Sequence, residues 1–183
     1  MKKIALFISI IIHYTNSYSQ VTFAKGYLVE LDGDTIRGEV KMNPKKDFDL
    51  FNKVFFKDES GVQKNYKPDK VKAYGFDGKH FIASLYEKEM MFYKILCNGT
   101  VRLYEMMYET QIMNEFSYKS EYFLSRKDDK EFTRLKPVKY KKQISEFLKD
   151  NPDIVQDTED DKKFEIEKIK DLINRYNSSA NSN

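Results

Sequence analysis

Short runs of alternating apolar and polar residues, separated by brief turn signals, follow one another from Gly26 to about Leu135. This pattern is typical of antiparallel strands joined by tight turns, and it excludes a mainly helical fold over that stretch. The turn signals are Asp32-Gly33-Asp34, Glu59-Ser60-Gly61, Asp77-Gly78, Asn98-Gly99 and, with weaker turn chemistry, Asp128-Asp129. The pattern predicts about ten strands of ordinary length in an antiparallel meander. They are Gly26–Leu31, Thr35–Met42, Val54–Lys57, Val62–Tyr66, Val71–Phe76, Lys79–Tyr86, Met91–Cys97, Thr100–Tyr108, Tyr122–Lys127 and Lys130–Leu135.

The Asn98-Gly99 pair is the preferred sequence for a type I′ turn, in which both central residues have positive φ. We therefore expect it to close a hairpin between Met91–Cys97 and Thr100–Tyr108. Simple alternation places Cys97 on the same strand face as Tyr93 and Ile95, where Cys behaves as a small buried hydrophobe. In an exported protein the alternative is a reactive or intermolecularly paired thiol.

Two of the predicted strands differ in their expected solvent exposure. In Thr35–Met42, Ile36 and Val40 fall on one side and charged residues on the other, which indicates a half-exposed strand. Thr100–Tyr108 carries mostly apolar or aromatic residues on both sides, interrupted by Arg102 and Glu105. That pattern predicts a strand covered on both faces, at the centre of a roll or beneath a helix. The alternative is an aromatic-rich outer face in water.

After Pro137 the apolar period changes from strand to helix. Lys139–Lys149 has helical spacing, Asn151-Pro152 reads as an N-cap followed by proline in the first turn, and Ile166–Asn177 presents one apolar stripe. The sequence thus predicts an α+β fold: a mostly antiparallel meander forming a roll or partial barrel, followed by two or three C-terminal helices. We expect one domain over 20–177, β-rich over 26–136 and helical over 138–177, with a disordered tail over 178–183.

The first residues have the order of a secretory signal peptide. Lys2-Lys3 precede nine mostly apolar residues from Ile4 to Ile12, and a polar stretch with Ser17-Tyr18-Ser19 follows. The apolar run is much shorter than the roughly 20 residues that span a bilayer. We therefore expect a signal peptide over 1–19, a periplasmic or secreted protein, and no transmembrane span in the mature chain.

Charge and composition exclude several classes of function. The 183 residues include one Cys and two His, with 32 Lys+Arg against 29 Asp+Glu. Cleavage after Ser19 would remove two lysines and one histidine, leaving 30 basic against 29 acidic side chains. A nearly neutral exported domain is a poor match for nucleic acid, even though Lys139, Lys141 and Lys142 flank Tyr140. One Cys excludes both a disulfide framework and a Cys-rich zinc site.

The N-terminal and C-terminal residues resemble a known family. Gly26-Tyr27-Leu28-Val29, then Gly33-Asp34-Thr35-Ile36 and Gly38, resemble the G-Y-[IV]-V…G-D-T-[IL]-x-G hairpin of uncharacterised exported proteins of Gram-negative bacteria. The terminal helix of those proteins ends in Tyr-Asn, here Tyr176-Asn177. They often carry Cys where this chain has Asn151, so the resemblance offers Cys97 no disulfide partner. The family implies no activity and no catalytic residue.

No residue of the chain is assigned as catalytic, cofactor-binding or metal-ligating. His80 is the one histidine beyond the leader, and near a hairpin end it is expected to be wet or locally hydrogen-bonded rather than a catalytic base. Asp32 and Asp34 lack the further ligands of a standard calcium loop, so Asp32-Gly33-Asp34 is interpreted as a tight turn. Gly38 marks a bulge or the close approach of another backbone.

These absences favour a non-enzymatic binding or interaction module of the cell envelope. Its expected partner is an envelope protein or a small apolar ligand enclosed by the curled sheet. The expected contact surface is the Tyr- and Met-bearing region Met90–Tyr108, provided that the helices leave it exposed. The alternative is a hydrolase of envelope or extracellular glycans, which requires two carboxylates converging in a cleft at roughly 5 to 9 Å.

Overall fold

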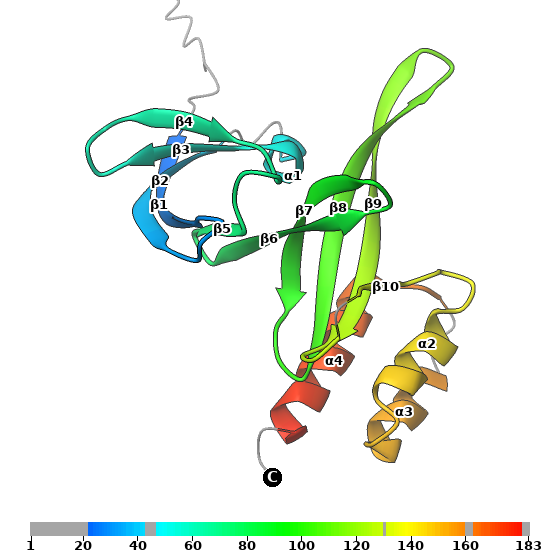
Figure 1. Ribbon diagram of the computed structural model, residues 1–183. Helices are drawn as coiled ribbons and strands as arrows, with labels where there is room; N and C mark the ends of the chain where they lie inside the picture. Colours follow the sequence, from blue (N-terminus) through cyan, green and yellow to red (C-terminus); the bar gives the residue numbers. More distant parts are fainter. Residues whose placement is uncertain (1–21, 43–46, 130, 160–162, 181–183) are drawn as a thin grey trace, which may run out of the picture.

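The computed structural model describes residues 22–42, 47–129, 131–159 and 163–180. The predicted signal peptide, 1–19, lies outside these residues. They form one open, ten-stranded antiparallel sheet followed by three C-terminal helices (Figure 1), which confirms the predicted α+β fold class.

The strands agree closely with the predicted set, with one large exception in β8 and β9. They are β1 (Thr22–Val29), β2 (Thr35–Met42), β3 (Val54–Asp58), β4 (Gln63–Tyr66), β5 (Ala73–Phe76), β6 (Lys79–Tyr86), β7 (Glu89–Cys97), β8 (Val101–Ile112), β9 (Glu115–Arg126) and β10 (Thr133–Arg134). The helices are α1 (Asp49–Asn52), α2 (Tyr140–Phe147), α3 (Pro152–Glu159) and α4 (Ile166–Ala180).

The sheet departs from a simple meander at β5. The strand order is β10-β9-β8-β7-β6-β5-β1-β2-β3-β4, so β5 pairs with β1 and not with its predecessor β4. β4 is polar and mostly exposed, whereas β5 buries Tyr74 and Phe76. Beside β1 these rings pack against the fully buried Leu28, which accounts for the return of β5 to that edge.

The N-terminal strands curl tightly, and Gly38 is one reason that they can. A Cβ on Gly38 would lie 2.2 Å from the carbonyl oxygen of Lys57 on the neighbouring strand. The predicted close approach of another backbone is therefore confirmed. The predicted Asp32 turn is also confirmed, because the Asp32 carboxylate accepts a hydrogen bond from the Asp34 amide at 3.0 Å.

The first half of β8 is covered on both faces, as its sequence predicts. Val101 and Leu103 pack in a cluster with the C-terminal helices, and Tyr104 and Met106 pack on the opposite face with β6 and β7. All four side chains are at most 1% exposed. Figure 1 shows α4 near one end of β8 and β7 running beside β8.

The predicted type I′ turn at Asn98-Gly99 is wrong, because neither residue has positive φ. Gly99 serves a different purpose: a Cβ there would lie 2.5 Å from the side chain of Asn177 in α4. The Asn177 amide group donates to the Val101 carbonyl at 2.8 Å, and its oxygen accepts from the Val101 amide at 2.9 Å. Gly99 therefore leaves room for the contact that fixes α4 to the start of β8.

Cys97 is buried as predicted, but on the other face of the sheet. The pairing of β7 with β8 shifts register between Ile95 and Cys97, which is the signature of a β-bulge. The extra residue rotates Cys97 away from Tyr93 and Ile95 and into the cluster beneath the helices. There the thiol donates to the Lys170 carbonyl at 3.6 Å, and burial raises its pKa to about 11.

The C-terminal helices follow the predicted boundaries closely. The Asn151 side chain accepts a hydrogen bond from the Ile154 amide at 3.3 Å, which confirms it as the N-cap of α3. In α4, Tyr176 is buried and its hydroxyl donates to the Asp150 carboxylate at 2.7 Å. The helix continues to Ala180, so residues 178–180, expected in a disordered tail, are helical, and 181–183 lie outside the described residues.

Candidate functional site

Two regions of the surface could act on a partner or ligand: a charged pocket on the N-terminal strands and an apolar arm formed by β8 and β9. The pocket has a volume of about 680 Å³ and is lined by residues of β1, β2, β3, β5 and β6 together with two of their turns. Lys25, Arg37 and Lys57 bring positive charge to it, and four carboxylates bring negative charge: Glu39, Asp58, Glu59 and Asp77. This mixed lining does not suit a small apolar ligand.

His80 lies in this pocket, locally hydrogen-bonded as predicted. The Tyr27 hydroxyl and the His80 Nδ1 are 2.9 Å apart, and both residues flank Gly75 on neighbouring strands. A Cβ on Gly75 would lie 2.5 Å from the Tyr27 ring, so the glycine lets the tyrosine lie flat across the sheet toward His80. No described Ser, Thr or Cys contacts His80 through a hydrogen bond, so this pair lacks the nucleophile that a catalytic base would serve.

Two carboxylates of the pocket are already held by neighbours. Glu39 accepts a hydrogen bond from the Lys57 ammonium group at 2.9 Å. Asp58 accepts from the Ser60 side chain and from the amides of Ser60 and Val62, which closes the β3–β4 turn. These contacts, led by the Ser60 side chain, lower the pKa of Asp58. A general acid for glycoside hydrolysis needs the opposite shift.

A buried carboxylate, Glu121, marks the boundary between the covered and the uncovered parts of β8 and β9. Glu121 is 8% exposed. Its oxygens accept from the hydroxyls of Tyr108 at 2.9 Å and Tyr86 at 3.2 Å, and they also contact the Arg134 guanidinium group. The hydrogen bond to Glu121 raises the pKa of Tyr108, since it would be lost on ionisation. All of these partners of Glu121 come from the protein itself, and the cluster connects β6, β8, β9 and β10.

Beyond Glu121 the two strands continue as an arm, which we define as residues 109–119. The sequence predicts separate strands ending at Tyr108 and beginning at Tyr122, but β8 and β9 pair continuously from Val101↔Arg126 to Ile112↔Glu115. The turn between them is Met113-Asn114, with φ of 49° and 67°. Because this turn contains neither Gly nor Pro, the usual turn signals miss it.

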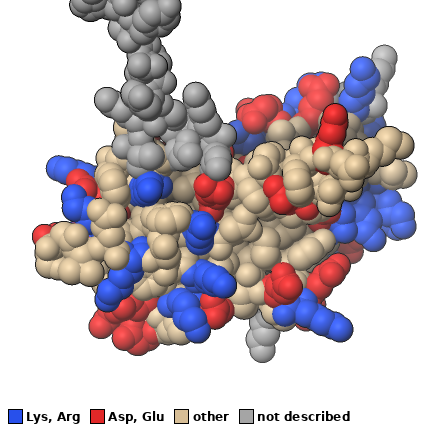
Figure 2. Space-filling view, turned by 90° about the horizontal axis from the view of Figure 1, so that it is seen from above, with Lys and Arg blue, Asp and Glu red and all other residues tan. Residues whose placement is uncertain are grey.

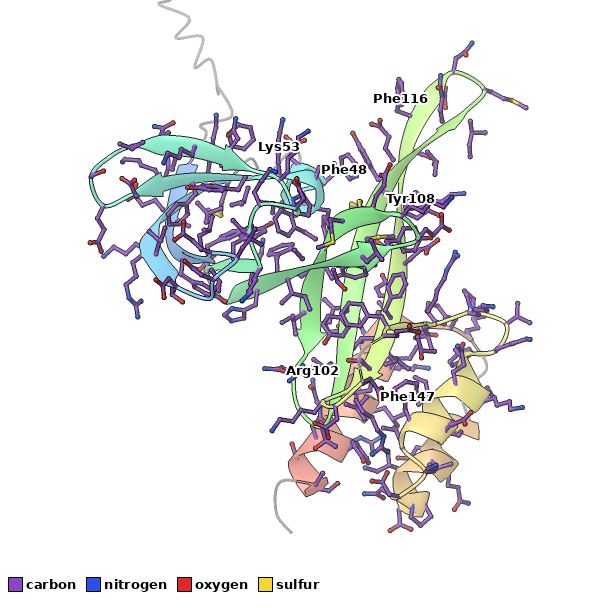
Figure 3. All side chains as sticks on the ribbon, viewed as in Figure 1. Phe48, Lys53, Arg102, Tyr108, Phe116 and Phe147 are labelled. Carbon is purple, nitrogen blue, oxygen red and sulfur yellow. The ribbon has the colours of Figure 1, made fainter. Side chains whose placement is uncertain are left out.

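The arm projects from the body of the molecule (Figure 1), and several of its apolar side chains are exposed. Ile112 is 54% exposed, Met113 95%, Phe116 65% and Tyr118 56%. Phe48, just before α1, contacts the base of the arm, with its ring centroid 4.6 Å from that of Tyr118. Figure 3 shows Phe116 standing away from the body near the end of the arm, whereas Phe147 lies among the C-terminal helices.

The backbone edges of the arm are unpaired within the described residues. β10 pairs with β9 only at Phe123 and Leu124, and the Leu135 amide donates to the Tyr122 carbonyl at 2.8 Å. From Glu115 to Lys119 the outer edge of β9 has no strand beside it in the described parts of the chain. Exposed apolar side chains therefore lie next to a row of unsatisfied backbone donors and acceptors.

Much of the region predicted for partner contact, Met90–Tyr108, is buried, although Met90 is 38% exposed. Tyr93, Tyr104 and Met106 are at most 1% exposed, because Phe132 and side chains of β6 such as Tyr86 pack over the face that the helices leave free. The exposed apolar residues lie a few positions further along the same hairpin. Tyr140 is 7% exposed and packs in the helical cluster, so it offers no aromatic surface among the neighbouring lysines.

Acidic and basic side chains occur together on the face of the molecule seen in Figure 2. Figure 2 shows small groups of acidic and basic side chains separated by uncharged surface. In the described parts of the chain, no three His, Cys, Asp or Glu side chains gather as a metal site. Within those same parts, no helix combines the length and the apolar character needed to cross a bilayer. No family model, no curated protein and no solved structure matches this chain.

Proposed function

We propose that this protein is an exported, non-enzymatic interaction module of the cell envelope, and that it binds a partner polypeptide along the β8–β9 arm. The observation that carries the proposal is the arm itself: four exposed apolar side chains beside an unpaired strand edge. Export is supported by the leader pattern of residues 1–19, and the lack of a described nucleophile near His80 supports a binding role over catalysis.

The partner is expected to be a polypeptide in extended conformation. An edge strand offers alternating amide and carbonyl groups that a second strand satisfies, while side-chain contacts supply specificity. On β9 the outward side chains available for such contacts include Phe116 and Tyr118, two large rings on one face. Aromatic residues of this kind are enriched at the centres of protein interfaces.

The proposal can be tested by photocrosslinking in intact cells. Phe116→p-benzoylphenylalanine places a photoreactive ring at the exposed end of the arm, and it should form covalent products of defined mass on irradiation. Val138→p-benzoylphenylalanine is the matched control, because Val138 is 95% exposed but lies at the start of the helical region. Equal yields from the two positions, or no product from either, would contradict a binding role for the arm.

A glycan hydrolase remains the second candidate only if two free carboxylates converge in the charged pocket. Glu39 and Asp58 are engaged by Lys57 and by the β3–β4 turn, which favours the binding module. Replacing Glu39 with Gln should leave any glycan turnover by the full chain unaffected, since we assign that side chain to an ion pair. Loss of a measurable hydrolytic activity in that variant would instead support the hydrolase.

A further inference from the structure

The outer edge of β9 in the arm is complementary to the same edge of a second copy when the two are placed antiparallel. We propose that two copies of the chain pair antiparallel through residues 115–119 of β9, with the two-fold axis passing beside Ser117. The inference rests on the proposed function, because it uses the same arm, and it names a second copy as the partner.

The hydrogen-bonding direction of the strand limits the possible registers. The Tyr122 carbonyl points outward, since it accepts from Leu135 on the far side of β9 from β8. Backbone groups alternate along a strand, so those of Phe116 and Tyr118 also point outward. In an antiparallel pair of two such edges, outward residues must oppose outward residues.

One allowed register makes both the charges and the rings complementary. With the axis beside Ser117, Phe116 of each copy lies opposite Tyr118 of the other as a hydrogen-bonded pair. Glu115 then lies opposite Lys119, again twice, at the closely spaced non-hydrogen-bonded positions. Cross-strand aromatic pairs and opposite charges both stabilise antiparallel sheets.

The neighbouring registers lose this match. An axis at Tyr118 places Glu115 opposite the buried Glu121, and an axis beside Lys119 places that lysine opposite itself. An axis at Phe116 leaves Lys119 opposite Met113. The unpaired edge of β8 beyond Met106 provides Glu109 and no basic residue as far as Ile112, so it cannot form an ion pair with its own copy.

Pairing also answers why a long two-stranded arm would be ordered. An isolated two-stranded hairpin is only marginally stable in water, and three or more strands are needed for a stable sheet. Natural edges are usually protected by proline, bulges or inward charges. The β8–β9 pairing runs without a register shift along the arm, and residues 115–119 contain no proline. Two copies would convert two exposed ribbons into one four-stranded sheet.

A disulfide tests the position of the axis. Ser117→Cys places a thiol opposite its own copy, so oxidation of the protein expressed from its full-length gene should give a covalent dimer. Ser120→Cys is the matched control on the same strand, because in this register its copy lies roughly 20 Å away along the strand. The wild-type protein, with the buried Cys97, reports the background. Equal dimer yields from the two variants would overturn the register.

Charge reversal tests the pairing without a covalent bond. Glu115→Lys and Lys119→Glu should each raise the dissociation constant of the dimer by about tenfold, measured by sedimentation. An equimolar mixture of the two variants should recover the wild-type association, because every Lys in one copy then faces a Glu in the other. A structural defect in either variant would not be repaired by mixing, so failure of the mixture to associate would overturn the proposal.

The two proposals fail in different ways. If the chain stays monomeric at its highest soluble concentration while the residue-116 crosslinker captures a different protein, the proposed dimer is wrong and the proposed interaction module stands. If neither copies nor other proteins are captured by the arm, both are wrong. Association of the arm with phosphatidylglycerol vesicles, without dimer formation, would also overturn the proposal that a second copy is the partner.

Discussion

The two ends of the β8–β9 hairpin belong to one continuous ladder but have opposite surroundings. Near the helices, Leu103 and Tyr104 are at most 1% exposed, whereas at the far end Ile112 and Phe116 are more than half exposed. The covered end carries apolar side chains on both faces, whereas residues 109–111 at the far end of β8 are polar. Periodicity therefore sets which face a residue occupies, but only the elements that return to cover the strands decide whether that face is buried.

The covered end receives its neighbours from both directions along the chain. Side chains of the preceding strand β6 pack over one face, and the following helices dock on the other. The arm extends past both, and only Phe48 of the described residues stacks on a ring at its base. We infer that the body provides the stability of the fold, while the arm is an element whose order depends on what it contacts.

The largest expected contrast comes from removing an aliphatic side chain at each end. Leu103→Ala should lower the free energy of unfolding by about 2–5 kcal/mol, because it leaves a cavity in a fully packed cluster. Ile112→Ala on the same strand should change it by less than about 0.5 kcal/mol. Urea denaturation of both variants measures the difference. Comparable losses would mean that the arm is part of the core.

The boundary between the two ends can be located with one residue type. Glu121→Ala should cost about 2 kcal/mol, since Tyr86, Tyr108 and Arg134 would lose their shared acceptor in a partly buried site. Arg134 is half exposed, which keeps the loss below that of a fully buried pair. Glu109→Ala is the control on the neighbouring strand β8, because Glu109 is exposed, and its urea midpoint should match that of the wild type.

The sequence predicts those features of the fold that depend on nearby residues better than those that depend on distant contacts. Local signals predict the ends of strands and helices well, because residues such as Asp32 and Asn151 act through their own side chains on nearby backbone. The apolar residues on both faces of Thr100–Tyr108 also predict a doubly covered strand. Such a strand gains stability only when both faces are shielded from water.

Features that depend on distant contacts are the ones that sequence reasoning misses. Asn98-Gly99 has the composition of a type I′ turn, but Gly99 is needed for the approach of Asn177, nearly eighty residues away. The bulge before Cys97 has no local signal. The arm is missed because Met113-Asn114 is a tight turn without glycine, so the sequence pattern does not reveal its exposed edge as a binding surface.

A smaller difference in stability, between two Tyr→Phe variants, tests whether water reaches the buried hydroxyls of the covered end. The Tyr93 hydroxyl is buried and has no hydrogen-bond partner among the described residues, whereas the Tyr104 hydroxyl pairs with Ser125 at 3.3 Å. Tyr93→Phe should therefore raise the free energy of unfolding by about 1 kcal/mol, and Tyr104→Phe should lower it by a similar amount. Equal effects would indicate that water reaches the Tyr93 hydroxyl.

The same tyrosine gives the pH dependence a definite sign. Burial raises the pKa of Tyr93 far above its usual value near 10, so the folded protein keeps a proton that the unfolded chain releases. Stability should be unaffected below about pH 10 and should fall as the pH rises further. In Tyr93→Phe this alkaline loss, followed by urea midpoints, should be shallower than in the wild type.

The smallest expected effect concerns two turns that share a strained backbone. Glu87, in the β6–β7 turn, and Met113, in the arm, have φ of 53° and 49°, a region that Asn tolerates better than either residue. Glu87→Asn should raise the global free energy of unfolding by about 0.5 kcal/mol, because the β6–β7 hairpin packs on the body. Met113→Asn should instead slow hydrogen exchange of the arm amides by about twofold and leave the urea midpoint unchanged, since the arm opens without unfolding the body. A shift of the urea midpoint in Met113→Asn as large as that in Glu87→Asn would show that both ends of β8–β9 unfold together, and the distinction between body and arm would then be structural only.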